Sequence, residues 1–138
     1  MNAETYICFD YGVKRIGVAV GQTLTGTATP LQTIKVINGR PDWDTITGII
    51  RQWQPQALII GIPIQMDDSR QDITADAERF ARQLEGRYQL QVFRTEERLT
   101  TYEARSRLKR TRNLDPVAAQ VILESWLQEK ANADNEQP

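Results

Sequence analysis

The order of strand-like and helical segments constrains the fold of this 138-residue chain most strongly. Three stretches with the alternation or β-branched content of strands come first, at 6–9, 16–20 and 28–37. Two further apolar stretches, at 57–60 and 89–95, follow segments with helical spacing. With two more helices at the end of the chain, the order is βββαβαβαα. It predicts an α/β fold in which helices cover the faces of a mixed sheet.

The ends of these elements have recognisable signals. The first two strands should form a hairpin, the third should end at the turn Asn38-Gly39, and the fourth should close at 61–63, Gly-Ile-Pro. Gly86 is expected to end the second helix. A Thr-x-x-Glu capping box beginning at Thr100 predicts a third helix, and the last one should begin at Asp115.

The composition excludes several kinds of chemistry. There is no histidine, so Ser-His and Cys-His catalysis and imidazole metal sites are excluded. The single cysteine, Cys8, forms no intramolecular disulfide and cannot build a thiolate zinc site. Any hard chemistry must therefore fall to carboxylates or to Lys, Arg, Tyr, Ser or Thr side chains, which favours carboxylate-held metals such as Mg²⁺ or Mn²⁺ over softer ones.

The chain has the size of one globular domain. We expect this domain at 1–130, followed by a polar and disordered tail at 131–138. The apolar stretches are far shorter than the roughly 20 residues that cross a bilayer, so no membrane association is expected. The first residues lack the pattern of a secretory signal, and the expected location is the cytoplasm.

Charge is distributed unevenly along the chain, although the net charge is only −1. Residues 87–112 contain eight basic and three acidic side chains, and the sequence turns acidic from Asp115 onward. A solvated helix face would explain the basic segment. The alternative is a rim that guides phosphate groups. The candidate nucleic-acid-binding residues, chosen for their closeness to acidic positions, are Lys14, Arg15, Arg98 and Arg105.

Three acidic residues are placed where elements of the expected sheet end. Asp10 ends the first strand, Glu97 follows the strand at 89–95, and Asp115 precedes Pro116 at a helix start. Each has an ordinary explanation: Asp10 as a turn residue, Glu97 as a solvated loop acid, and Asp115 as a helix N-cap. Hydrolysis of a phosphodiester with two metal ions requires acids that converge from several elements, and these three could do so.

Four ordered sequence blocks carry a resemblance to a known family. The blocks are FDYGVKRIGVAVG, GIPIQMDDS, TEERLTTYEA and LDPVAAQVILESW. In this order and spacing they resemble the signature blocks of the YqgF (RuvX-like) family of Holliday junction resolvases or pre-16S ribosomal RNA nucleases. The resemblance implies a ribonuclease H-like fold with a five-stranded mixed sheet flanked by helices. It also implies that Asp10, Glu97 and Asp115 are the catalytic, metal-binding acids.

The resemblance further implies a hydrolase, a nuclease that uses Mg²⁺ or Mn²⁺ to process pre-16S rRNA during ribosome biogenesis. Its partners would be RNA, ribosomal precursor particles and possibly structured DNA. The sequence departs from the family pattern at three positions. Glu96 replaces an aspartate, which makes the choice between Glu96 and Glu97 as ligand less secure. Pro116 stands where serine is common. Asp68 replaces a glycine, and with Asp67 it becomes an auxiliary acid candidate.

Three alternatives to rRNA processing remain open at this stage. Resolution of four-way DNA junctions would require a symmetric dimer with two active sites. Actin-like and sugar-kinase ATPases share the Asp-x-Gly start of Asp10 but need two such subdomains, and this chain has room for one. A non-catalytic RNA-binding module could retain the same fold. Such a module would have no reason to keep all three acids.

Overall fold

The structure, a computed structural model, describes residues 4–12, 14–65, 72–99 and 115–136. Within these ranges it contains seven strands and three helices. The strands are β1 (Thr5–Asp10), β2 (Arg15–Gln22), β3 (Ala28–Pro30), β4 (Ile34–Ile37), β5 (Arg40–Pro41), β6 (Ala57–Gln65) and β7 (Val92–Leu99). The helices are α1 (Trp43–Trp53), α2 (Asp72–Tyr88) and α4 (Asp115–Glu136).

All seven strands belong to one mixed sheet in the order β5-β4-β2-β1-β6-β7, and β3 also pairs with β2. The strands β1 and β2 form the predicted antiparallel hairpin, with Asp10 opposite Gly17. β6 runs parallel to β1 on its other side, and β7 runs parallel to β6. This arrangement confirms the predicted α/β, ribonuclease H-like class of fold.

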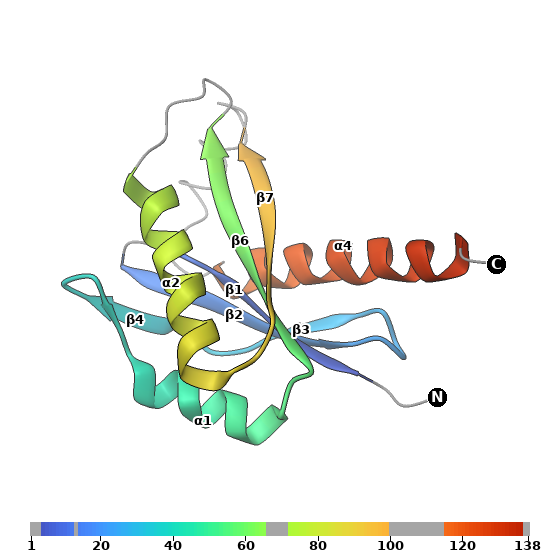
Figure 1. Cartoon of the computed structure of the whole chain (residues 1–138), viewed down its shortest axis with the longest axis horizontal. Helices are drawn as coiled ribbons and strands as arrows, with labels where there is room; N and C mark the ends of the chain where they lie inside the picture. The colour runs from blue at the N-terminus through green and yellow to red at the C-terminus, as the bar shows by residue number, and fades with distance from the viewer. Residues whose placement is uncertain (1–3, 13, 66–71, 100–114, 137–138) are drawn as a thin grey trace.

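The helices cover the two faces of the sheet separately (Figure 1). One face carries Ile7, Phe9 and Ile60, which form a buried cluster with side chains of α1 and α2. The opposite face carries Cys8, Ile59 and their neighbours, which pack against α4. Because successive residues of a strand point to opposite faces, each strand position can be assigned to the α1/α2 face or to the α4 face.

The predicted strand at 28–37 is divided in the structure. β3 pairs with β2 at Gly21, Val20 and Ala19, whereas β4 pairs farther along β2, at Ile16 and Arg15. Leu31 still donates to the carbonyl of Val18, but the chain then leaves β2 and pairs with it again only at Ile34, so the prediction of one continuous strand at 28–37 is wrong. With the two-residue β5, this division raises the strand count from five to seven.

The strand β6 is longer than predicted, because it continues through Gly61-Ile62-Pro63 to Gln65. The N–H of Leu58 donates to the carbonyl of Gln91, just before β7, so the backbone groups of even-numbered β6 residues face β7. The backbone groups of odd-numbered β6 residues, including Pro63, face the β1 side. β1 ends at Asp10, opposite Gly61. No β1 residue therefore lies beside Pro63, so the N–H that proline lacks interrupts no hydrogen bond of the sheet, and proline is tolerated there.

The turn between β4 and β5 confirms a prediction, and the end of α2 corrects one. Asn38 and Gly39 both have positive φ, 53° and 74°, as the tight β4–β5 hairpin requires. The side chain of Asp42 accepts a hydrogen bond from the N–H of Thr45 and caps α1. Gly86, however, lies inside α2. The left-handed residue at the end of that helix is Gln89, with φ 55°.

Helix α4 is anchored on the sheet by close packing and by two hydrogen bonds. A Cβ at Gly21 would lie 3.0 Å from the side chains of Leu123 and Leu127, so this glycine lets the helix approach β2. Gln120 donates to the carbonyl of Ala28, and Glu124 accepts from its N–H. These contacts satisfy an edge residue of β3 and fix the position of α4.

The C-terminal end of α4 reaches Glu136, so the helix extends into the segment 131–138 where a polar tail is expected. The domain boundary at residue 130 stays a prediction. The predicted helix at Thr100 lies outside the described residues. Among the helices that the structure describes, none is long and apolar enough to cross a membrane.

Candidate carboxylate site on the α4 face

Asp10 is the last residue of β1 and is half-buried. It lies on the α4 face, since Cys8 belongs to the cluster under α4 and Phe9 belongs to the opposite one. Its register partners on both neighbouring strands are glycines, Gly17 on β2 and Gly61 on β6. The residues directly opposite Asp10 on both neighbouring strands therefore contribute no side chain to this face.

The register of β7 separates Glu96 from Glu97. Gly61 is opposite Thr95, and Pro63 is opposite Glu97. The positions of Thr95 and Glu97 are on the same face of β7 as Phe93, which packs against the α4-side cluster. The position of Glu96 is on the same face as Val92, which belongs to the other cluster. The position of Glu97 therefore belongs to the same face as Asp10. It lies two strands away, about 10 Å across the sheet, and about 7 Å farther along it.

Asp115 is the first residue of α4, the helix that covers this face. The ring of Trp126, three turns later, packs against Tyr6 near the start of β1, with 4.9 Å between ring centroids. In Figure 1 the helix runs back along β1 in the opposite direction, so α4 begins toward the end of β1 that carries Asp10. The three predicted acids thus occupy backbone positions on one face and toward one end of the sheet.

The side chains of Glu97 and Asp115 lie outside those that the structure describes, as do Asp67 and Asp68. Within the described part of the chain, no three acidic or cysteine side chains form a group that could hold a metal ion. The structure therefore supports a shared face for the three backbone positions, and the ligand assignment stays a prediction.

The four candidate phosphate-binding residues are placed differently. Arg15 begins β2 two positions before Gly17, so it shares the α4 face with Asp10. Lys14 is exposed in the β1–β2 connection. On β7, the position of Arg98 is on the same face as Arg94 and Glu96, which is the face opposite to that of Asp10. Arg105 lies outside the described residues.

The connection between Asp10 and Arg15 depends on a close backbone approach at Gly12. A Cβ built on Gly12 would lie 2.6 Å from the carbonyl oxygen of Arg15, a distance that side chains do not adopt. The carbonyl of Lys14 accepts a hydrogen bond from the N–H of Val36, which fixes the connection to β4. The glycine of the FDYG block thus allows the tight turn that places Arg15 near Asp10.

Tyr11, the residue after Asp10, packs on the opposite face of the sheet. Its ring is buried against Phe80 of α2, with 5.3 Å between centroids. Burial, and then the negative charge of Asp76, raise the pKa of the Tyr11 phenol, and nearby Arg79 partly opposes this shift. The neutral ring thereby holds the end of β1 against α2.

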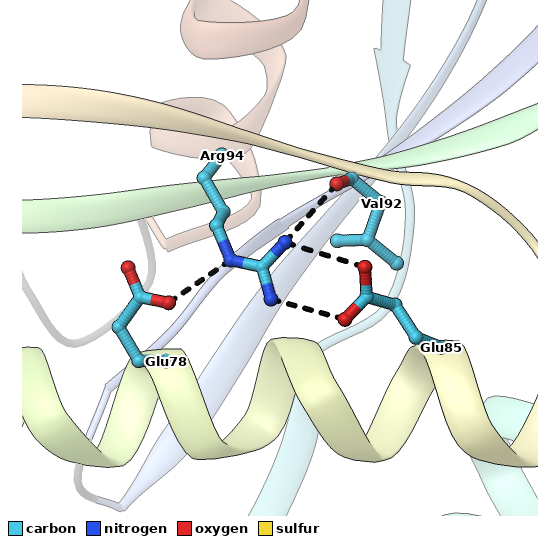
Figure 2. A network of polar contacts seen from close by, with 4 residues as sticks. All are labelled: Glu78, Glu85, Val92 and Arg94. Carbon is cyan, nitrogen blue, oxygen red and sulfur yellow. Dashed lines mark hydrogen bonds and ion pairs between the residues drawn. The ribbon is translucent and has the colours of Figure 1, made fainter.

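An ion-pair network that sequence reasoning missed occupies part of the basic segment (Figure 2). Arg94 on β7 donates from Nε to Glu78 at 2.9 Å and from its two Nη atoms to Glu85 at 3.0 and 3.3 Å. Hydrogen bonding to Glu85 is the largest contribution that raises the Arg94 pKa. Arg87 lies over the ring of Trp43 at 4.1 Å. These two arginines link elements of the fold, so the basic segment is not a uniform phosphate rim.

Comparisons with known proteins agree over nearly the whole chain. A family model described as RuvX, Holliday junction resolvase, matches residues 4–129. A relative from Aeromonas hydrophila with the curated name "Putative pre-16S rRNA nuclease" is 45% identical over 94% of this chain and 99% of its own. One from Legionella pneumophila with the same name is 50% identical over the same shares. Archaeoglobus fulgidus Pelota superposes with a TM-score of 0.50 and 11% identity over 96% of this chain and 36% of its own, a likeness of fold alone.

Proposed function

Since the chain belongs to the RuvX family, a family of nucleases, we propose that it hydrolyses phosphodiester bonds in the precursor of 16S ribosomal RNA. The observation that carries the proposal is the match to relatives named for this activity. They are 42–50% identical to this chain, and the alignments span most of both proteins. The proposed substrate is therefore RNA, in free precursor or in precursor particles.

We propose Asp10, Glu97 and Asp115 as the residues that hold the divalent metal. The residues fit such an ion in two respects. Carboxylate oxygens are the ligands that Mg²⁺ and Mn²⁺ prefer. The residues directly opposite Asp10 on both neighbouring strands are glycines, so no cross-strand side chain at those two positions would compete with a metal and a phosphate group. When bound, the metal would supply an activated water and stabilise the charge on the leaving oxygen.

The chain's own residues would bind and orient the substrate. Arg15, on the face of Asp10, and exposed Lys14 would bind the phosphates next to the reacting group. Arg98 and Arg105 remain candidates for the same role. The tight turn at Gly12 would set the spacing between the carboxylate of Asp10 and these cations.

A cleavage assay tests the proposal. Purified protein with Mg²⁺ or Mn²⁺ should cut a labelled precursor of 16S rRNA, and Asp10→Asn should lose that activity while binding the RNA as tightly as the parent. Failure of the parent to cut in either metal, with RNA binding retained, would favour a non-catalytic binding module. Cleavage by Asp10→Asn at the parent's rate would contradict the assigned site.

Resolution of four-way DNA junctions is the second candidate, because the matching family model carries that description. This activity would require two active sites presented by a dimer. The same assay therefore includes a synthetic four-way junction, and the oligomeric state is measured by light scattering. Symmetric cutting of the junction by a dimer, with intact precursor RNA, would replace the first proposal with the second.

A further inference from the structure

Three basic residues follow one another across the sheet from the position of Asp10 toward its β5 edge. Arg15 on β2 is directly opposite Lys35 on β4, and the next residue on this face of β4, Ile37, is opposite Arg40 on β5. Lys35 and Arg40 are both exposed. We call Arg15, Lys35 and Arg40 the basic track.

The basic track lies on the α4 face, as Asp10 does. On β4, Ile34 and Val36 are buried in the α1/α2-side cluster, so Lys35 and Ile37 belong to the other face. On β5, Pro41 is buried opposite Val36, so Arg40 also belongs to that face. The strand spacing puts the Cα of Lys35 roughly 12 Å from that of Asp10, and the Cα of Arg40 roughly 20 Å from it.

The hairpin that carries the far part of the track has a fixed shape. Asn38 and Gly39, both with positive φ, close a tight two-residue turn, and the Val36 N–H to Lys14 carbonyl bond of 2.9 Å joins β4 to the β1–β2 connection. In Figure 1 the β4–β5 hairpin and the β1–β2 connection lie at the same end of the sheet. The backbone positions of the track are therefore joined by hydrogen bonds to the connection that follows Asp10, and preorganisation of this kind lowers the cost of binding a ligand.

One neighbouring acid offsets part of this charge. Hydrogen bonds from Thr45 are the main cause that lowers the pKa of Asp42, and the positive charge of Lys35 makes the smallest contribution. Both oxygens of the Asp42 carboxylate are bound to Thr45 of α1. The carboxylate is thus engaged as the helix cap, and Lys35 keeps donors for another anion.

We propose that the basic track binds consecutive phosphates of the nucleic-acid strand that extends from the carboxylate site. The proposal rests on the proposed nuclease function for the identity of the ligand. It adds Lys35 and Arg40 as substrate-binding residues and gives the strand a direction, from Asp10 across β2 and β4 to β5. The contacts are to phosphate, so they should be independent of sequence.

The test is a salt titration of binding with cleavage suppressed by EDTA. The probe is a fluorescein-labelled RNA stem-loop with a single-stranded tail, and binding is followed by anisotropy. Loss of two phosphate contacts in the double variant Lys35→Gln/Arg40→Gln should reduce the slope of log K against log salt by about 1.4 for a single strand, or about 1.8 for a duplex. Across a tenfold decrease in salt, the parent should then gain roughly 25-fold more affinity than the variant.

The matched control is Arg51→Gln/Arg82→Gln, which removes the same charge from exposed positions of α1 and α2, on the other face. Its slope should equal the parent's, and circular dichroism should show that both variants fold. An equal slope in the track variant and the parent, an equal loss in both variants, or no binding by the parent would overturn the proposal. Because the readout is binding without turnover, failure of the nuclease proposal would appear separately, as absence of cleavage.

Discussion

Replacing Arg94 with methionine separates the structural role of the basic segment from a phosphate-binding role. Methionine keeps the apolar stem and removes the guanidinium that joins β7 to Glu78 and Glu85 of α2 (Figure 2). The Arg94 side chain is 30% exposed, and its partners are 34% and 41% exposed, so solvent weakens each pair. At about 0.5–1 kcal/mol for each of the two ion pairs, we expect the free energy of unfolding to fall by about 1–2 kcal/mol.

Urea unfolding followed by circular dichroism measures this loss, and the control is Arg79→Met. Arg79 pairs with Asp76 within one turn of α2 and is 55% exposed, so its removal should cost about 0.5 kcal/mol or less. A double-mutant cycle of Arg94→Met with Glu85→Gln should give a coupling energy of about 0.5–1 kcal/mol. Added salt should reduce this coupling.

The same variant should bind RNA as the parent does, because the guanidinium is already paired with two carboxylates. A salt slope reduced by about 0.7–0.9, the value of one phosphate contact, would refute this reasoning and return Arg94 to the phosphate rim. A loss of stability no greater than that of Arg79→Met would refute the proposed role in joining β7 to α2.

Three further substitutions test the packing around the site. Gly12→Ala should slow single-turnover cleavage by roughly 10- to 100-fold, because its Cβ would meet the Arg15 carbonyl at 2.6 Å. The control is Gly48→Ala, whose Cβ would meet nothing beyond its own helix within 4 Å, and equal rates for the two variants would contradict the argument. Phe80→Ala should cost about 3–5 kcal/mol in urea unfolding, since Phe80 contacts three aromatic rings in the core; a loss below about 1 kcal/mol would contradict it. Asp42→Ala should lower the melting temperature above pH 3.8, because hydrogen bonds from Thr45 lower the folded-state pKa of Asp42. This stabilisation is lost as the pH falls through the lowered pKa, so the difference should shrink with acidification, and a difference that does not depend on pH would contradict it.

Local signals predicted much of the fold. The apolar run of β1, the alternation in β2 and the Asn38-Gly39 turn each depend on residues close together in the chain, and the structure confirms them. The lengths of strands were less predictable. Pro63 suggests a strand end, yet β6 continues because β7 pairs with it on one side after β1 has ended on the other. Such pairing is a long-range property that no local pattern contains.

In the candidate site, too, local features were predictable from the sequence and long-range neighbours were not. The strand end at Asp10 was evident from the sequence, but its two glycine neighbours, Gly17 and Gly61, are visible only from the register. The ion pairs of Arg94 also required the packing of α2 on β7. Lys35 and Arg40 have no motif to mark them, and only the order of the strands places them in line with Arg15.

The central proposal is that carboxylates on the α4 face perform the hydrolysis, and adjacent residues of β7 test it most directly. The backbone position of Glu97 is on the same face of the sheet as Asp10, and that of Glu96 is on the opposite face. The measurement is the single-turnover rate of precursor RNA cleavage at saturating protein for Glu97→Gln and for Glu96→Gln. The account predicts a loss of at least about 100-fold for Glu97→Gln, as for a metal ligand, and a rate within a few-fold of the parent for Glu96→Gln. Equal losses, or a greater loss for Glu96→Gln, would contradict it.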